Sequence, residues 1–323
     1  MVKINDTFWN QHPELRVGRI VIFTDDPGWH GKQLSLAFAS RGYASDYVSL
    51  TQCRFAIEPG RQPIFIPGFE HALPDAVFVR GVPGGSLEEV VLYLDILHAL
   101  KAMGIPVYND GHAVERSVDK AMTSFLLHHA GLPTPMTWVL RDRDEALRIA
   151  EAELKQGNLL ISKPLFGSQG EGIRRIEKST DLFWLTGSHG VYYLQRFVHC
   201  EGEGFSDNRV FVINGIAVAA MRRRGKFWLN NVARGATCEL IDLEPEMVDF
   251  AVKATTALAM DYAGVDIIKD REGRCTIIEV NSIPAWKGLE SVCDVNIAGL
   301  MVNDLITRKM NINQPQISTD AHG

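Results

Sequence analysis

The segment ISKPLFGSQGEGIRRI, residues 161–176, places a glycine-rich run between one lysine and two arginines. Lys163 ends a short apolar stretch and an alternating segment follows the glycines, so the pattern predicts two strands joined by a turn. A dinucleotide fingerprint has glycines that open a helix, and a Walker A loop has Gly-Lys followed by Ser or Thr. Neither motif fits, because the glycines of this segment join two strands and none of them is followed by Lys and then Ser or Thr.

Two interpretations of this hairpin stay open from its residues alone. It is either a flap whose backbone N–H groups close over a polyphosphate while Lys163 supplies charge, or a surface hairpin without a ligand. Residues farther along the chain favour the flap.

A second polar group lies on two strands near the C-terminus. Asp266 is on one predicted strand, and Glu279 and Asn281 are on the next, with a turn at 271–273 between them. A hairpin brings such strands side by side, and residues two apart on a strand share a face, so three oxygen ligands can converge. Few carboxylates and only oxygen donors suit Mg²⁺. Ordinary exposed strand residues are the alternative, but Asp and Asn are poor strand formers.

The composition limits the classes of function. Hydrophobic residues make up 46% of the chain and charged residues 22%, as in an ordinary globular protein. The net charge of −6 argues against general nucleic-acid binding. No apolar run approaches the roughly 20 residues of a membrane span, and the N-terminus lacks the apolar core of a signal peptide. The five cysteines are scattered and odd in number, which indicates reduced thiols in a cytoplasmic protein.

Strands and helices alternate over the first 115 residues, which predicts a parallel α/β domain. Ser86 and Glu89 form a capping box that opens an amphipathic helix ending near Lys101. The loop at 80–86 lies between a predicted strand end and this helix, where open α/β sheets bind ligands. A plain turn is an equally good interpretation of the loop.

The later part of the chain changes character. Ser117 is expected to cap a helix that runs to Ala130. A hairpin is predicted at Asn214-Gly215, and Pro245 opens a helix that reaches about Tyr262. Strands are expected at 136–140, 159–163, 173–176, 192–197, 208–213, 216–222, 264–268 and 275–280, with helices near 144–156 and 296–309.

Seven motifs in a fixed order resemble the ATP-grasp superfamily, and most closely the RimK-like branch of ATP-dependent glutamate ligases. The resemblance covers about residues 105–310. The motifs are SVDKAMTSFLLHHAGLPTP, LLISKPLFGSQGEGI, YYLQRFV, DNRVFVI, NNVARGA, AGVDII and IIEVNSIPAWKGLE.

The resemblance implies an ATP-grasp fold, α/β overall and α+β in its C-terminal part, behind a Rossmann-like parallel-sheet domain. Together with the alternation over the first 115 residues and the polar character of the tail, it divides the chain into an N-terminal domain (1–115), a central subdomain with the flap (116–200), a C-terminal subdomain with the metal site (201–310) and an expected disordered tail (311–323).

The same resemblance implies a role for each matching residue. Two lysines would contact the ATP phosphates, three flap residues would cover them, three linker residues would meet the adenine largely through backbone groups, and an acid would lie beside the ribose. Three residues would hold Mg²⁺, and four would line the phosphate and acceptor-carboxylate region. In that order they are Lys120 and Lys163; Ser168, Gln169 and Gly170; Gln195, Arg196 and Phe197; Asp207; Asp266, Glu279 and Asn281; and Arg209, Arg223, Asn231 and Arg234.

The implied activity is ATP-dependent amide-bond formation through an acylphosphate. The expected ligands are ATP, Mg²⁺ with Mn²⁺ as the alternative, L-glutamate as the amine, and a carboxylate-bearing acceptor, with a small molecule favoured over a protein tail. Neither nucleic acid nor a membrane is an expected partner, and a homo-oligomer is compatible with the sequence. Two other functions stay open: an ATP-grasp kinase, which would form ADP without an amide, and a non-catalytic nucleotide-binding module.

Overall fold

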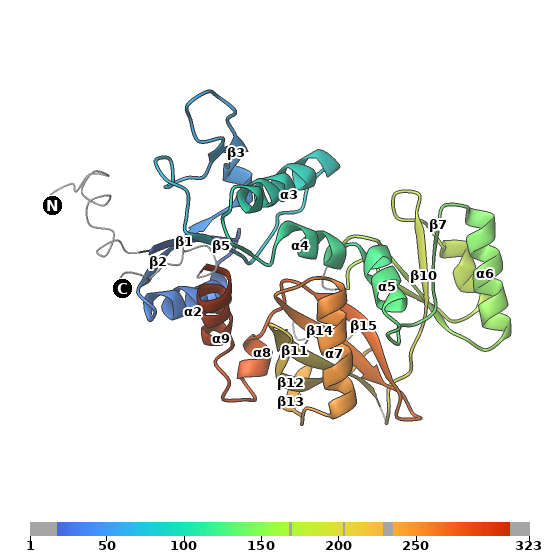
Figure 1. Ribbon diagram of the computed structural model, residues 1–323. Coiled ribbons are helices and arrows are strands. Elements are labelled where there is room, and N and C mark those ends of the chain that lie inside the picture. Colours follow the sequence, from blue (N-terminus) through green and yellow to red (C-terminus); the bar gives the residue numbers. More distant parts are fainter. Residues whose placement is uncertain (1–17, 168–169, 203, 229–234, 311–323) are drawn as a thin grey trace, which may run out of the picture. The chain divides into compact units, whose positions relative to one another are not determined.

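The computed structural model describes residues 18–167, 170–202, 204–228 and 235–310, and it divides into two compact units (Figure 1). The first unit comprises residues 1–111 together with 296–323, and the second comprises residues 112–295. Ser168, Gln169, Asn231, Arg234 and the tail from Asn311 therefore lie outside the described residues. Each unit is described by itself below.

The first unit is built on a parallel sheet in the order β2-β1-β5-β6, as the alternation of strands and helices predicts. Residues Ile20–Phe23 are completely buried, as is usual for a central parallel strand covered on both faces. The strands are β1 (Gly18–Phe23), β2 (Tyr43–Val48), β5 (Ala76–Val79) and β6 (Val107–Tyr108), with a small antiparallel pair β3 (Arg54–Phe55) and β4 (Ile64–Phe65), and the helices are α2 (Gly28–Ala39) and α3 (Leu87–Ala102).

Local signals set the ends of α3. The Ser86 side chain accepts from the Glu89 N–H, and the Glu89 carboxylate accepts from the Ser86 N–H, so the predicted capping box is present. Gly104 follows the helix with φ +83°, a conformation in which glycine avoids the strain of a side chain. The helix therefore begins and ends where its sequence predicts.

Helix α9 (Ile297–Asp304) belongs to the first unit, although the division by sequence groups it with residues 201–310. It packs against α2, and the Tyr108 hydroxyl donates a 2.7 Å hydrogen bond to Asp304 Oδ2. Position along the chain does not determine which core an apolar helix enters, because burial depends on the complementary surface.

The second unit contains two antiparallel sheets. The smaller has the order β7-β10-β8-β9 and packs one face on α6. The larger has the order β13-β12-β11-β14-β15 and packs one face on α7. The elements are β7 (Thr137–Leu140), α6 (Arg143–Lys155), β8 (Leu160–Lys163), β9 (Arg174–Ile176), β10 (Tyr192–Arg196), β11 (Phe205–Ile213), β12 (Ile216–Gly225), β13 (Thr237–Leu240), α7 (Pro245–Ala257), β14 (Tyr262–Lys269), β15 (Cys275–Asn281) and α8 (Lys287–Glu290).

The predicted hairpin between β11 and β12 is present. Asn214 has φ +49° and Gly215 has φ +70°, the left-handed pair that a two-residue turn needs to match strand twist. Strands β8 and β9 pair antiparallel on either side of the glycine-rich segment, as the opening motif predicts.

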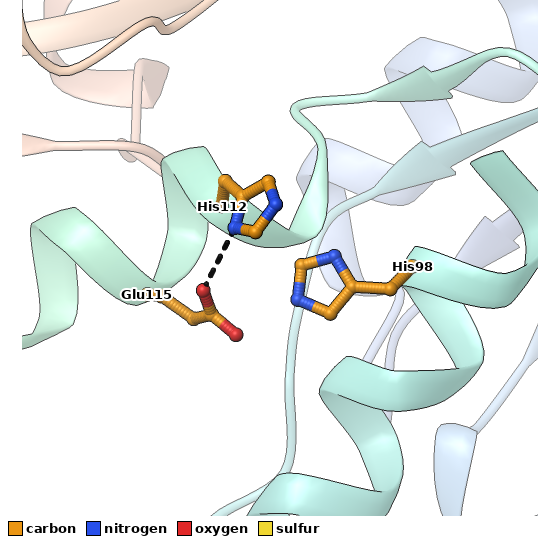
Figure 2. A group of neighbouring side chains, drawn as sticks. All are labelled: His98, His112 and Glu115. Atoms are coloured by element: carbon orange, nitrogen blue, oxygen red, sulfur yellow. Dashed lines mark hydrogen bonds and ion pairs between the residues drawn. The ribbon is translucent and has the colours of Figure 1, made fainter. Parts of the chain in front are cut away.

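The expected helix from Ser117 is wrong in its start. Two helices occur instead, α4 (Gly111–Val118) and α5 (Lys120–His129), and Asp119 caps the second by accepting from the N–H groups of Ala121 and Met122. Ser117 instead lies within α4, where its hydroxyl donates to Ser282 Oγ. On α4, His112 Nδ1 lies 3.2 Å from Glu115 Oε2 (Figure 2).

Three further features complete the description of the fold. Helix α7 ends at Ala257, earlier than expected, because Ala259 takes φ +56° before β14 begins. All five cysteines are free thiols. Among the residues that the structure describes, no helix combines the length and apolar character needed to cross a bilayer.

Candidate functional site

One face of the larger sheet carries a group of five charged side chains, Asp207, Arg209, Arg223, Asp266 and Glu279. Cross-strand pairing sets Asp207 opposite Arg223, Arg209 opposite Asp266, and Asp266 opposite Glu279. Directly paired residues share a face, and so do residues two apart along a strand. The other face carries the apolar core under α7. The sheet thus presents one polar face, made by β11, β12, β14 and β15, with Asn281 at its end.

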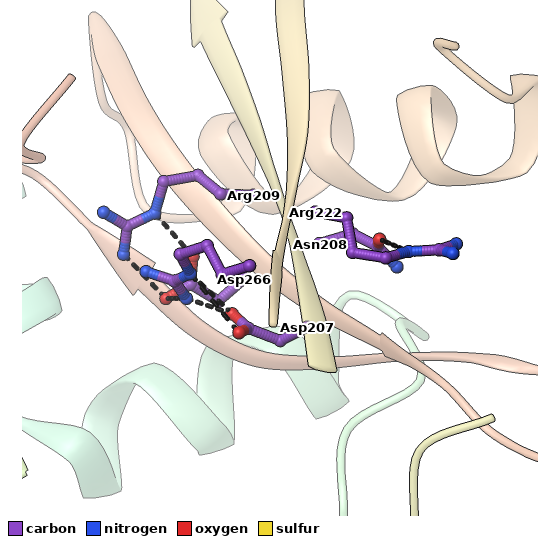
Figure 3. Close-up of polar contacts among 6 residues, drawn as sticks. Asp207, Asn208, Arg209, Arg222 and Asp266 are labelled. Carbon is purple, nitrogen blue, oxygen red and sulfur yellow. Dashed lines mark hydrogen bonds and ion pairs between the residues drawn. The ribbon is translucent and has the colours of Figure 1, made fainter. Parts of the chain in front are cut away.

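Four of these side chains form a buried ionic cluster, defined as Asp207, Arg209, Arg223 and Asp266 (Figure 3). Arg209 holds Asp266 in a two-bond fork, with Nε to Oδ1 at 2.7 Å and a terminal nitrogen to Oδ2 at 2.8 Å. Arg223 lies 2.9 Å from Asp266 Oδ2 and also contacts both oxygens of Asp207. The Arg223 side chain is only 6% exposed, so these ion pairs are shielded from water.

The two carboxyl groups of the cluster differ in acidity. Burial disfavours the charge on Asp266, but the guanidinium groups of Arg209 and Arg223 outweigh it and hold its pKa below the ordinary value. Burial prevails at Asp207, where the attraction of Arg223 is opposed by the charge of Asp266, so its pKa is raised. Asp266 is therefore the more firmly ionised of the two.

Arginines on successive positions of β12 meet different surroundings. Arg223 is buried in the ionic cluster, whereas Arg222 donates to Asn208 Oδ1 at 3.2 Å on the opposite side of the sheet (Figure 3). Arg224 pairs with Glu239 and is 45% exposed. The alternation predicted from the sequence separates these three residues as expected.

Two lysines face the same polar region from outside the larger sheet. Lys120, at the start of α5, donates to the Gly167 carbonyl at 2.9 Å. Burial lowers the pKa of Lys163 to about 8, with Glu279 opposing the shift and Lys120 adding to it. Burial also lowers the pKa of Lys120, again against the attraction of Glu279. Glu279 is thus close enough to act on both ammonium groups.

Gln195 supports Lys163, a role that the resemblance does not imply. Lys163 Nζ donates to Gln195 Oε1 at 2.7 Å, and Gln195 Nε2 donates to Thr137 Oγ1 and to the Tyr193 hydroxyl, each at 3.0 Å. The Gln195 side chain is 1% exposed. Alternation could have signalled this contact, because β8 and β10 pair with Lys163 and Gln195 on one face.

The other linker residues divide between the two faces of the smaller sheet. The Arg196 side chain forms an ion pair with Glu153 on α6, so it lies on the face away from Lys163. Phe197 packs edge-to-face with Trp228 at 6.2 Å between ring centroids. Arg175, on β9, lies 5.4 Å from the Phe197 ring and 5.7 Å from the Trp228 ring.

A cavity of about 680 Å³ adjoins β9 and the glycine-rich segment. Its described lining mixes basic, acidic, aromatic and hydroxyl side chains, and it includes both Lys163 and Trp228. The basic and aromatic lining residues are Lys163, Arg174, Arg175, Trp184 and Trp228. Gly170, the remaining flap candidate within the described residues, has φ +75°, which suits glycine in a turn.

The donor set at the end of the larger sheet fits a hard divalent cation. Asp266 and Glu279 offer carboxylate oxygens from paired strands, and Asn281 offers an amide. The Asn281 Nδ2 atom is buried and has no hydrogen-bond partner among the described residues. The oxygen and the nitrogen of a side-chain amide are assigned from their contacts, so the amide of Asn281 can be turned to put its oxygen at the unpartnered position. A divalent cation bound there would supply the missing partner.

Some site residues escaped the sequence analysis. Cys238 lies opposite Arg223 on β13, and burial raises the pKa of its thiol against the pull of Arg223. Strand β13 was not expected, since its four residues lack an alternating apolar pattern. Arg175 and Trp228 meet only through tertiary contacts, so no spacing in the sequence could have linked them.

The chain matches known proteins over most of its length. The family model of the RimK-like ATP-grasp domain matches residues 117–305. A tetrahydromethanopterin:alpha-L-glutamate ligase of Methanocaldococcus jannaschii is 36% identical over 240 residues, which cover 72% of this chain and 79% of the relative. The ligase of the same description from Methanosarcina acetivorans is 30% identical over 318 residues, covering 86% of this chain and 95% of the relative.

Solved structures share the fold. A RimK domain ATP-grasp protein from Sphaerobacter thermophilus superposes with a TM-score of 0.67 at 18% identity, covering 88% of this chain and 98% of that chain. The ATP-grasp ligase PsnB, solved with a minimal precursor, Mg and ADP, superposes with a TM-score of 0.68 at 22% identity, covering 92% of this chain and 99% of that chain. The ATP-grasp fold expected from the seven motifs is confirmed.

The family establishes the class of chemistry. Its matched relatives are ligases, and the ATP-grasp fold uses ATP together with a divalent metal ion. The expectation of an ATP-dependent ligase is thereby confirmed, against a kinase or a non-catalytic module. The chain belongs to the RimK-like ATP-grasp family.

Proposed function

We propose that this chain joins L-glutamate to a carboxylate-bearing small molecule, such as a coenzyme precursor, at the cost of ATP. Relatives at 36% and 30% identity are described as tetrahydromethanopterin:alpha-L-glutamate ligases, which supports both the amino acid and the class of acceptor. The observation that carries the proposal is the polar face of the larger sheet, where carboxylates, guanidinium groups and nearby lysines meet.

The proposed reaction has two chemical steps. An acceptor carboxylate oxygen attacks the γ-phosphorus of ATP, and the bond between this phosphorus and the bridging oxygen breaks. The products of this step are ADP and an acylphosphate. The glutamate amine then attacks the acyl carbon, phosphate departs, and the amine loses its proton. Charge neutralisation and alignment are the main tasks of the protein in such transfers.

The residues divide these tasks by their position. Lys120 and Lys163 would contact ATP phosphates, and Arg209 would face the transferred phosphoryl group. Arg223 would hold a substrate carboxylate, because a planar guanidinium fork matches two oxygens. Supporting this assignment, Arg223 is buried on the polar face whereas Arg222 and Arg224 are not part of it.

Asp266, Glu279 and Asn281 would hold the divalent ion, and Mg²⁺ suits them better than a softer metal because every donor is oxygen. Bound there, the ion supplies positive charge beside the phosphates. Gln195 would keep Lys163 oriented through the hydrogen bond between them.

The test is a product assay. Purified full-length chain with Mg²⁺ and ATP would be offered each amino acid together with a panel of coenzyme carboxylates, while ADP is measured and products are weighed by mass spectrometry. The proposal expects ADP only with a suitable acceptor, and a product heavier by one glutamate residue. A phosphorylated product without an amide would instead identify a kinase, and ADP release with any other amine would refute glutamate as the substrate.

A further inference from the structure

Gly264 lies on an inner strand of the larger sheet, on the face that carries the proposed metal ligands. It is buried, and it pairs directly with Asn281 on β15 and with Phe211 on β11. Directly paired residues share a face, and their Cβ atoms lie about 4.5–5.5 Å apart. The glycine therefore leaves, beside Asn281, a space that the Cβ atom of any other residue would occupy.

The segment that follows Asn281 fills this space. A Cβ atom added to Gly264 would lie 2.8 Å from Pro284 Cβ, which is closer than two non-bonded carbon atoms approach without strain. The Pro284 atom belongs to a ring closed on the backbone, so it cannot turn away as the end of a flexible side chain can. Pro284 is itself buried. Glycine is therefore the residue that allows the chain after β15 to pack this closely on β14.

Arg209 borders the same space from β11. Its Cδ and Nε atoms would each lie 3.5 Å from the added Cβ atom, an ordinary contact distance. The same Nε atom donates to Asp266 Oδ1 at 2.7 Å. The arginine that orients a metal carboxylate, the paired residue Asn281 and the ring of Pro284 thus meet over one glycine.

A second contact holds the same segment on the sheet. Trp286 is completely buried and packs edge-to-face on Phe211, with 6.5 Å between the ring centroids. Phe211 is paired with Gly264, so both contacts lie on one face. Pro284 and Trp286 therefore hold the chain after Asn281 against the polar face at two points.

Resting on the function proposed above, we propose that Gly264 is a positioning residue of the metal site. Its missing side chain lets Pro284 close over β14, and this close packing holds the Asn281 amide beside the carboxylates that would bind the cation. The Asn281 Nδ2 atom is buried and has no hydrogen-bond partner among the described residues, so the direction of the amide depends on where the backbone places it. Groups that orient metal ligands contribute to metal affinity without touching the ion.

The first test adds the methyl group that Pro284 excludes. Gly264→Ala should raise the Mn²⁺ Kd of the nucleotide-free, full-length protein by about 10- to 100-fold, with the free ion counted by electron paramagnetic resonance. Asn281→Ala should itself weaken binding. In that background Gly264→Ala should change the Kd by no more than about twofold, because a ligand that is absent cannot be misplaced. A general disturbance of the strands would instead weaken binding further.

Two substitutions at Pro284 test whether the close contact is the cause. Pro284→Gly removes the Cβ atom, so adding Gly264→Ala to it should leave the Mn²⁺ Kd within about twofold of Pro284→Gly alone. Pro284→Ala is the matched control, because it removes the ring but keeps the Cβ atom, and in this background Gly264→Ala should still raise the Kd by about tenfold or more. Equal effects of Gly264→Ala in the two backgrounds would overturn the proposal.

An extra atom in a packed interior can also prevent folding. If Gly264→Ala does not fold, the double variant Gly264→Ala/Pro284→Gly should regain the melting transition and the Mn²⁺ affinity of Pro284→Gly. A double variant that stays unfolded while Pro284→Gly folds would refute the positioning role. A natively folded Gly264→Ala protein that binds Mn²⁺ as the wild type does would refute it as well.

The proposed function can fail separately. If the wild type forms the glutamate product but Gly264→Ala keeps full Mn²⁺ affinity, only the positioning role of Gly264 is wrong. If the two Pro284 backgrounds differ as expected but the wild type forms no amide with any acceptor, Gly264 positions a metal ligand in a protein with another reaction.

Discussion

The two sheets of the second unit hold their cations by different means. The smaller sheet presents Lys163 on a neutral cradle, in which Gln195 accepts from the ammonium and is itself oriented by Thr137 and Tyr193. The larger sheet presents Arg209 and Arg223 on buried carboxylates. Neutral hydrogen-bond partners allow the lysine to gain or lose its proton, whereas buried carboxylates keep the arginines charged and fix the orientation of their guanidinium groups.

Because of this difference, the two sheets should respond to different changes in pH and in sequence. Burial lowers the pKa of Lys163 to about 8, so its charge varies within the physiological range. Arg223 stays charged, because its carboxylate partners raise a pKa that burial alone would lower. The larger sheet should therefore respond to charge substitutions, and the smaller one to pH and to the loss of neutral hydrogen bonds.

The largest effect is expected at the metal carboxylate. Glu279→Ala should reduce Mg²⁺-dependent ATP turnover by about a hundredfold or more, because the ion loses one of two carboxylates that balance its charge. The side chain is half-buried at the end of β15, so the melting temperature should change little. Near-normal turnover in a natively folded variant would remove Glu279 from the site.

The next largest effect is expected at Arg223, which is compared with Arg222 and Arg224 on the same strand. Arg223→Lys keeps the charge but loses the fork, and it should weaken use of glutamate by roughly 1–3 kcal/mol, or about 5- to 150-fold in kcat/KM. The same change at Arg222 or Arg224 should cost little, since Arg222 lies on the opposite side of the sheet and Arg224 is exposed. Equal losses at all three positions would mean that the polar face is not the substrate face.

A smaller effect tests the neutral cradle. Gln195→Met keeps the volume but removes the side-chain oxygen that accepts from Lys163, while Tyr193 keeps its hydrogen bond to Ser124, so ATP affinity should fall by about tenfold. Isothermal titration with a non-hydrolysable ATP analogue measures it. Gln156→Met, at the exposed end of α6, is the control and should bind as the wild type does. A Gln195 variant with unchanged affinity would show that Lys163 needs no support.

The smallest effect is the pH dependence. Lys163 loses its charge as pH rises through about 8, and ATP phosphates would raise its pKa again, so binding above about pH 8 should take up a proton. Titrations in two buffers of different ionisation enthalpy should therefore give different heats near about pH 8.5 and equal heats near about pH 6.5. If the two buffers give equal heats at both pH values, Lys163 does not change its protonation state when the nucleotide binds.

Local residues were enough to predict much of the fold. Ser86 and Glu89 signalled the start of α3, Asn214-Gly215 signalled the hairpin of the larger sheet, and alternation placed Arg223 and Arg222 on opposite faces. These features depend on residues close together in the chain, where backbone preference and side-chain period act directly. The ordered motifs likewise indicated the family before any contact was known.

Tertiary structure alone decided how the charges are paired. The two ion pairs of Arg223, with Asp207 and with Asp266, depend on the register of three strands, β11, β12 and β14. Gln195 contacts Lys163 only because β8 and β10 lie side by side. In the same way, Asp119 displaced Ser117 as the cap, and α9 joined the first unit. Sequence spacing carries preferences of single segments, but burial and ion pairing are properties of surfaces that form only when distant segments meet.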